Sequence, residues 1–160
     1  IGERPVKYGR ALGDLQRAVH PDRFANASDQ ERLLSVQQAA LVNEAYQTLK
    51  SPLLRARYLL ELQGIALNDT DTTMDPMFLM EQIELRESLA AVPGLGDPFA
   101  PLMALRDTID AKDKSFISSL SEAFARGDEA ALHGARDTVR KMQFMEKLLS
   151  EVEELEEELV

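Results

Sequence analysis

The sequence predicts an all-α protein in which a helical hairpin is followed by an antiparallel three-helix bundle. Apolar side chains recur with the period of an α-helix along almost the whole chain, and no segment shows the strict alternation of a β-strand. Proline, glycine and helix-capping residues divide this pattern into separate helices. With 160 residues, 44% of them hydrophobic, the chain is long enough to bury a core.

The first helix is expected from about residue 5 to residue 19. Its apolar side chains recur on one face, at Tyr8, Leu12, Leu15 and Val19. Pro5 suits its first turn, where the missing N–H costs nothing. Pro21 disfavours the helical conformation of His20, so the helix should end there.

Two further helices complete the front part of the chain. Ser28 and Glu31 have the spacing of a capping box, which predicts the start of a helix that runs to the Ser51-Pro52 step. A shorter helix over residues 52–63 then ends at Gly64. We therefore predict a first domain over residues 1–64.

The rear part of the chain has the pattern of a helical bundle. Residues 65–75 are rich in Asp and Thr, which predicts a linker. Asp75, followed by Pro76, begins the first of three helices, which are expected over about residues 76–92, 99–125 and 129–158. Because the connections between them are short, the helices should run antiparallel, forming a second domain over residues 76–160.

Charge is distributed unevenly between the two parts. Residues 1–64 hold nine Lys or Arg and seven Asp or Glu, a net charge of +2, whereas residues 65–160 hold nine and twenty-one, a net charge of -12. The acidic part argues against binding to nucleic acid or to an anionic membrane surface. There is no cysteine, so disulfides and thiolate metal sites are excluded. No apolar run approaches the roughly 20 residues that span a bilayer.

The tripeptide His20-Pro21-Asp22 allows three interpretations. It is a turn between helices, part of a catalytic site, or a tip that docks on another protein. A catalytic His–Asp pair needs a nucleophile or a metal beside it, and the only other histidine is His133. Arg10 and Arg17 share the helix face opposite the apolar one, and Arg23 follows the tripeptide, so this surface suits an acidic partner.

The helix after Asp75 carries more apolar residues than bundle packing requires. One face, with Phe78, Leu85, Leu89 and Val92, is sufficient for the bundle. Leu79, Met80 and Ile83 point elsewhere, next to Glu84 and Glu87, and Phe144 lies off the apolar face of the last helix. These residues either pack against neighbouring helices or form an exposed protein-binding patch with an acidic rim. The six methionines are otherwise interpreted mostly as core or near-core residues.

Four segments in this order resemble the HscB co-chaperones of iron–sulfur cluster assembly, a family of J-domain proteins. The segments are HPDRFA, VNEAYQTLKSPLLRARYLL, DPMFLMEQIELRE and RKMQFMEKL. The resemblance covers residues 5 to 160. It implies a co-chaperone that delivers an IscU-type iron–sulfur scaffold protein to an HscA/DnaK-class ATP-dependent chaperone and stimulates the chaperone's ATPase.

The resemblance also implies two protein-binding sites. The chaperone-binding residues would be His20, Pro21, Asp22, Arg10, Arg17 and Arg23. The scaffold-binding residues would be Leu79, Met80, Ile83, Glu84, Glu87 and Phe144. No enzymatic activity of its own, no cofactor and no metal site are expected.

The sequence departs from the family pattern at its start. The family has a short apolar helix before the basic one, and residues 1–4 do not match it, so we expect part of the first helix's apolar face to be uncovered. Alternatives are a J-domain co-chaperone for general protein folding, a small hydrolase that uses His20 and Asp22, and a purely structural helical protein. The expected location is the bacterial cytoplasm, or the mitochondrial matrix if the protein is eukaryotic.

Overall fold

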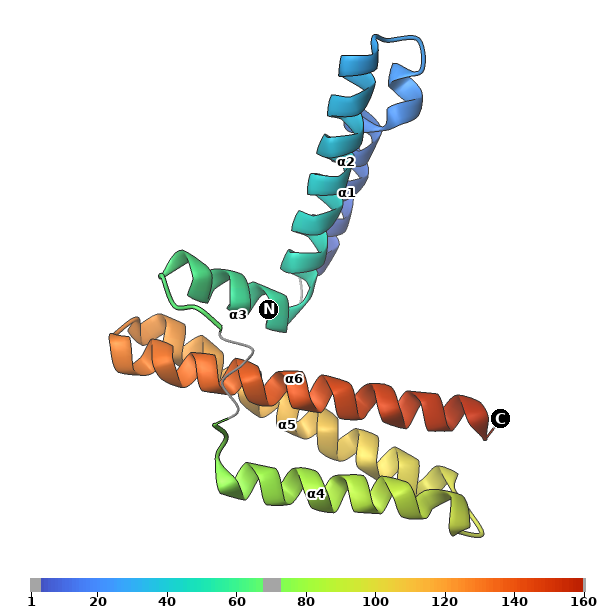
Figure 1. The fold of residues 1–160 in the computed structure, drawn as a ribbon, viewed down its shortest axis with the longest axis vertical. Coiled ribbons are helices and arrows are strands. Elements are labelled where there is room, and N and C mark those ends of the chain that lie inside the picture. Colours follow the sequence, from blue (N-terminus) through green and yellow to red (C-terminus); the bar gives the residue numbers. More distant parts are fainter. Residues whose placement is uncertain (1–3, 68–72, 160) are drawn as a thin grey trace. The chain divides into compact units, whose positions relative to one another are not determined.

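A computed structural model describes the backbone of residues 4–67 and 73–159, and the side chains within these ranges from residue 9 onward. Every regular element in the described ranges is helical, which confirms the all-α prediction (Figure 1). The chain forms two compact units, Ile1–Tyr58 and Leu59–Val160. Each unit is described separately below.

The first unit is built on a helical hairpin. Helix α1 (Arg4–Val19) packs along α2 (Asp29–Lys50), and a short 3₁₀ helix, η1 (Pro21–Phe24), connects them (Figure 1). Helix α3 (Pro52–Leu62) follows and continues into the second unit. The predicted helix boundaries agree with these to within one or two residues.

The start of α2 confirms the predicted capping box. The Ser28 hydroxyl accepts a hydrogen bond from the Glu31 N–H at 3.3 Å, and the Glu31 carboxylate accepts one from the Ser28 N–H at 2.9 Å. These bonds to Ser28 favour the charged carboxylate and lower the pKa of Glu31. The capping box therefore fixes where the loop after η1 ends and α2 begins.

An apolar groove of about 300 Å³ runs between α1 and α2. It is lined by Ala11, Leu12, Leu15, Leu41, Val42, Ala45, Tyr46 and Leu49. The side chains of Leu15 and Leu41 remain 51% and 64% exposed, so the hairpin buries its apolar seam only in part, as the sequence predicted for Leu12 and Leu15. The predicted seam residue Tyr8 lies outside the described side chains.

The second unit is an antiparallel three-helix bundle, as predicted. Its helices are α4 (Pro76–Ala91), α5 (Phe99–Arg126) and α6 (Glu129–Glu158), with a short 3₁₀ helix, η2 (Val92–Gly94), after α4 (Figure 1). Gly127 ends α5 with a left-handed backbone at φ 67°, which suits glycine. Asp75 caps α4, accepting from the Met77 N–H at 3.0 Å, and Asp128 caps α6, accepting from the Ala131 N–H at 2.9 Å.

The bundle core lies where α4 and η2 meet α5 and α6. Its buried side chains are Phe78, Leu89, Val92, Leu102, Leu105, Ile109, Met145, Leu148 and Val152. This confirms the predicted core face of α4. Helix α4 is also tied to its neighbours by ion pairs, from Arg86 to Glu151 on α6 and from Glu81 to Lys112 on α5, the latter at 2.6 Å.

Gln82 is a polar residue that the sequence analysis did not place in the core. It is only 4% exposed and lies on the buried face of α4. Its amide nitrogen donates to the Met145 sulfur, a weak acceptor, and its amide oxygen has no hydrogen-bond partner among the described residues. A buried, unpaired amide oxygen lowers the stability of the folded bundle.

Replacing Gln82 by methionine should therefore stabilise the bundle by about 1 kcal/mol, because methionine has a similar size and no polar atom to desolvate. Urea unfolding followed by circular dichroism would show a higher midpoint with an unchanged slope. Gln143→Met on α6 is the matched control, since Gln143 is only half-buried and its replacement should change stability little. A midpoint for Gln82→Met at or below the wild-type value would contradict the prediction.

Two carboxyl groups on α5 and α6 are destabilising at neutral pH. Partial burial, and then the charge of Asp110, raise the pKa of Asp113. Partial burial, and then the charge of Asp113, raise the pKa of Glu146. A carboxyl whose pKa is higher in the folded than in the unfolded state weakens folding above both values, and the effect disappears as the pH falls through the folded-state pKa.

Asp113→Asn should consequently stabilise the bundle at pH 7 by roughly 0.5 kcal/mol, the scale of one solvent-screened charge interaction. The gain should shrink as the pH falls and Asp113 of the wild type becomes protonated. Thermal unfolding of both proteins between pH 4 and pH 7 would measure this convergence. Asp107→Asn, an exposed position on the same helix, serves as the control. A gain that is independent of pH would contradict the electrostatic explanation.

Candidate protein-binding sites

The His20-Pro21-Asp22 loop is an exposed tip of the first unit. His20 is the N-cap of η1, with an extended backbone, and its Nδ1 accepts a hydrogen bond from the Asp22 N–H at 3.2 Å. The carboxylate of Asp22 lies 3.6 Å from the same nitrogen. The two side chains are 56% and 91% exposed, so the loop presents them to solvent in a defined arrangement.

The arginines near this loop occupy two different environments. The guanidinium of Arg23 turns back and donates to the carbonyl of Arg17 at 3.0 Å, which satisfies a backbone acceptor at the end of α1. The side chain of Arg17 forms an ion pair with Asp14 and is 78% exposed, and Arg10 is exposed on the same helix. Arg23 thus holds the loop against α1, Arg17 is exposed but paired with Asp14, and Arg10 is exposed with no ion pair among the described residues.

The predicted scaffold-binding residues on the second unit are exposed. Leu79 is 40% exposed, Met80 59% and Ile83 56%, and Glu84 and Glu87 are exposed beside them on α4. Neither carboxylate takes part in an ion pair within the described residues. Together with Phe144, which is 42% exposed on α6, these residues are called the α4 face below. An exposed group of large apolar side chains with an acidic rim is typical of a protein-binding site.

An aromatic cluster connects Phe144 to α4. The ring of Phe78 packs edge-on against Phe144 at 6.2 Å and against Phe116 at 6.3 Å between centroids. Lys141 lies over the Phe78 ring at 5.5 Å and bonds the Asp75 carboxylate at 3.1 Å. Phe144 is therefore held beside α4 by buried contacts while part of its ring remains in solvent.

Sequence reasoning missed two exposed methionines, one of them in this region. Met77, interpreted as near-core, is 74% exposed, and Met103 on α5 is 66% exposed. Met77 borders a hollow of about 440 Å³, called the α4–α5 hollow below. Its lining residues are Asp75, Met77, Phe78, Met80, Glu81, Glu84, Lys112, Phe116 and Lys141. Met77 lies in the first turn of α4, away from the Phe78–Leu89 face, and this position could have indicated that its side chain is exposed.

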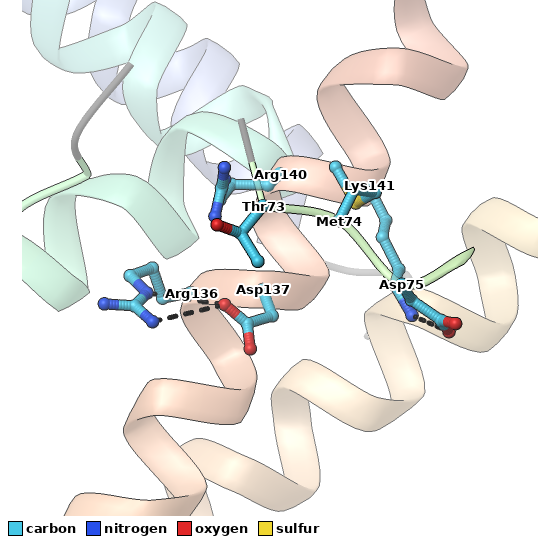
Figure 2. A pocket seen from close by; sticks show the side chains of 7 residues that line it. All are labelled: Thr73, Met74, Asp75, Arg136, Asp137, Arg140 and Lys141. Carbon is cyan, nitrogen blue, oxygen red and sulfur yellow. Dashed lines mark hydrogen bonds and ion pairs between the residues drawn. The ribbon is translucent and has the colours of Figure 1, made fainter. Parts of the chain in front are cut away.

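A second hollow, of about 460 Å³, lies beside it at the start of α4 (Figure 2). It is lined by Thr73, Met74, Asp75, Arg136, Asp137, Arg140 and Lys141. Figure 2 shows Lys141 pointing to Asp75 and Arg136 pointing to Asp137. Its side chains thus carry both signs of charge, and Asp75 and Lys141 belong to both hollows.

Neither candidate site contains a set of residues for metal binding. Within the described ranges, no three His, Asp or Glu side chains come together in a way that would hold an ion. His133 is 46% exposed and lies 3.8 Å from Glu129 on the surface of α6. In the same ranges, no helix is long and apolar enough to cross a membrane.

Comparison with known proteins finds relatives that match nearly the whole chain. Residues 74–153 match the family described as the HSCB C-terminal oligomerisation domain. The Co-chaperone protein HscB homolog of Vibrio cholerae is 48% identical over 91% of this chain and 84% of its own, and that of Aliivibrio fischeri is 47% identical over 92% and 85%.

Two solved structures share the fold. Chaperone HscB from Vibrio cholerae superposes with a TM-score of 0.86 at 44% identity, covering 98% of this chain and 90% of its own. Human co-chaperone protein HscB gives a TM-score of 0.85 at 33% identity, covering 95% and 74%. The chain belongs to the HscB family, the J-domain co-chaperones of iron–sulfur cluster assembly.

Proposed function

We propose that this co-chaperone delivers an IscU-type iron–sulfur scaffold protein to an HscA/DnaK-class chaperone and stimulates the chaperone's ATPase. One observation carries the proposal: two exposed surfaces of different chemistry lie on two separate compact units. The tip at His20 is polar with basic residues on α1 behind it, and the α4 face is apolar with an acidic rim. Two such surfaces on one chain suit an adaptor that binds two different proteins.

The tip on the first unit suits a role in which it binds the chaperone while ATP hydrolysis takes place in the chaperone. Asp22, at 91% exposure, can accept a charge-assisted hydrogen bond from an arginine of the chaperone. Arg10 favours docking on an acidic surface, and Arg17 would contribute by exchanging its exposed partner Asp14 for an acidic residue of the chaperone. By binding one conformational state of the chaperone more tightly than another, the co-chaperone shifts that equilibrium and needs no catalytic residue of its own.

In this proposal the scaffold binds to the α4 face. Burying Leu79, Met80, Ile83 and Phe144 against a partner would supply the main favourable contribution to binding, as the apolar centre of an interface commonly does. Glu84 and Glu87 at the rim would select a partner with basic residues at the matching positions. The flexible thioether of Met80 allows the surface to adapt to that partner.

Chaperone ATPase measured with and without this protein, in the presence and absence of scaffold, tests the proposal. We expect stimulation that is greatest when this protein and the scaffold are both present. Because the apolar groove between α1 and α2 is partly open, the assay should include a version with an apolar helix ahead of residue 1. No stimulation by either version would contradict the proposal.

A second candidate function for the α4 face is self-association, since the matching family is described as an oligomerisation domain. Light scattering of the pure protein distinguishes the two. A stable oligomer that dissociates when the scaffold is added would mean that copies of the chain and the scaffold compete for this face. A co-chaperone for general folding, the other alternative, would bind unfolded chains as tightly as the scaffold.

We also propose that the protein works in the bacterial cytoplasm. The relatives at 47–48% identity are bacterial. Detection of the tagged protein in cell fractions of a bacterial host, together with the scaffold, would test this location.

A further inference from the structure

The α4–α5 hollow adjoins the α4 face directly. Met80 and Glu84 belong to both, so no other residue separates the exposed apolar surface from the hollow. Its volume of about 440 Å³ is many times the roughly 30 Å³ that one water occupies in the liquid. The surface available to a partner therefore continues from the α4 face around the helix toward α5.

The walls of the hollow provide apolar contacts. Phe78 is buried behind it and Phe116 is half-buried on its α5 side, while Met77 stands at the opening with 74% of its surface exposed. Met77 is not among the side chains of the bundle core. A flexible, exposed thioether beside two aromatic rings suits contact with an apolar side chain of a partner.

The charges around the hollow favour a cation at its rim. Lys112 is paired with Glu81 at 2.6 Å and Lys141 with Asp75 at 3.1 Å, so both cations are already neutralised within the unit. Glu84 takes part in no ion pair among the described residues, and its carboxylate remains available. An incoming lysine or arginine would gain a partner there, whereas an acidic residue would be repelled.

We propose that the α4–α5 hollow is a subsite of the scaffold-binding surface that accepts an apolar side chain flanked in sequence by a lysine or arginine. The apolar side chain contacts Met77 and Phe116, and the basic one pairs with Glu84. This inference rests on the proposed function, because it assigns the scaffold as the occupant. It adds Met77 and Phe116 to the binding surface and states which kind of scaffold segment lies over them.

Affinity measurements with a positive charge introduced at Met77 test the subsite. Met77→Lys should weaken scaffold binding about tenfold, because it removes an apolar contact and places a second cation where the basic residue of the scaffold would lie. A lysine in the first turn of α4 is disfavoured only slightly by the helix dipole, so the bundle should remain folded, which circular dichroism would check. Met103→Lys is the matched control, with a methionine of similar exposure on α5, and should change affinity less than twofold.

Crosslinking identifies the scaffold segment that enters the hollow. The chain has no cysteine, so Met77→Cys can be labelled at a single position with a photoreactive maleimide. After irradiation in the complex, mass spectrometry should locate the crosslink in a segment with an apolar residue next to a lysine or arginine. Met103→Cys, labelled in the same way, should crosslink weakly.

The outcomes separate the two proposals. If the wild type binds the scaffold and Met77→Lys binds it equally well, or if the crosslink lies in an acidic segment, the subsite is overturned and the proposed function is left intact. Absence of any scaffold binding by the wild type overturns both. A loss of affinity in Met77→Lys but not in Met103→Lys, together with a crosslink to a segment that holds apolar and basic residues, supports both.

Discussion

Replacing Leu79, Met80 and Ile83 together by alanine is expected to weaken scaffold binding by roughly 100-fold or more, since each truncation of a buried interface residue costs about 1–2 kcal/mol. The three side chains are 40%, 59% and 56% exposed in the free protein, so their truncation removes apolar surface that only a partner would bury. For the same reason the bundle should keep its stability. Isothermal titration calorimetry of the purified chain with an IscU-type scaffold measures the loss.

The control for this triple variant lies in the same unit. Leu95 and Met103 are 48% and 66% exposed, outside the α4 face, and their joint replacement by alanine should leave affinity unchanged. Circular dichroism and unfolding midpoints of both variants would show that the bundle is intact. Unchanged affinity in the triple variant would contradict the assignment of the α4 face, and equal losses in both variants would indicate nonspecific apolar binding.

Local signals in the sequence were sufficient to predict the helices. The start of α2 was predicted from Ser28 and Glu31, and both hydrogen bonds of the capping box are present. The end of α5 was predicted near residue 125, and the helix ends at Arg126, followed by Gly127 in the left-handed conformation that commonly ends a helix. These signals act within four or five residues, so they need no knowledge of the tertiary packing.

The sequence could not show which apolar residues outside the core face of each helix are exposed, because their exposure depends on how closely α5 and α6 approach α4. Met142 and Met145 are buried as interpreted, but Met77 and Met103 are exposed, and a methionine suits either environment. The burial of Gln82 was missed because a polar side chain usually lies at the surface. Its position one turn from Phe78 places it on the buried face of α4 despite its polar side chain.

His20→Gln is expected to reduce stimulation of the chaperone's ATPase to the level without co-chaperone. In the structure His20 caps η1 through Nδ1, and this bond holds the Asp22 backbone in place. Glutamine has a longer, more flexible side chain, so the cap and the orientation of the Asp22 carboxylate should both be lost. Because the His20 side chain is 56% exposed, the substitution should leave the unfolding midpoint almost unchanged. Steady-state ATP hydrolysis at saturating scaffold measures the effect.

Three controls make this result specific to the tip. Asp22→Asn should cause a similar loss, since it removes the charge proposed to meet a chaperone arginine. His133→Gln alters the only other histidine, which is 46% exposed on α6, and should retain full stimulation. Scaffold affinity of His20→Gln should equal that of the wild type, because the α4 face belongs to a different unit. Full stimulation by His20→Gln would instead support a purely structural turn. Loss of scaffold binding in the same variant would mean that the tip and the α4 face do not act independently.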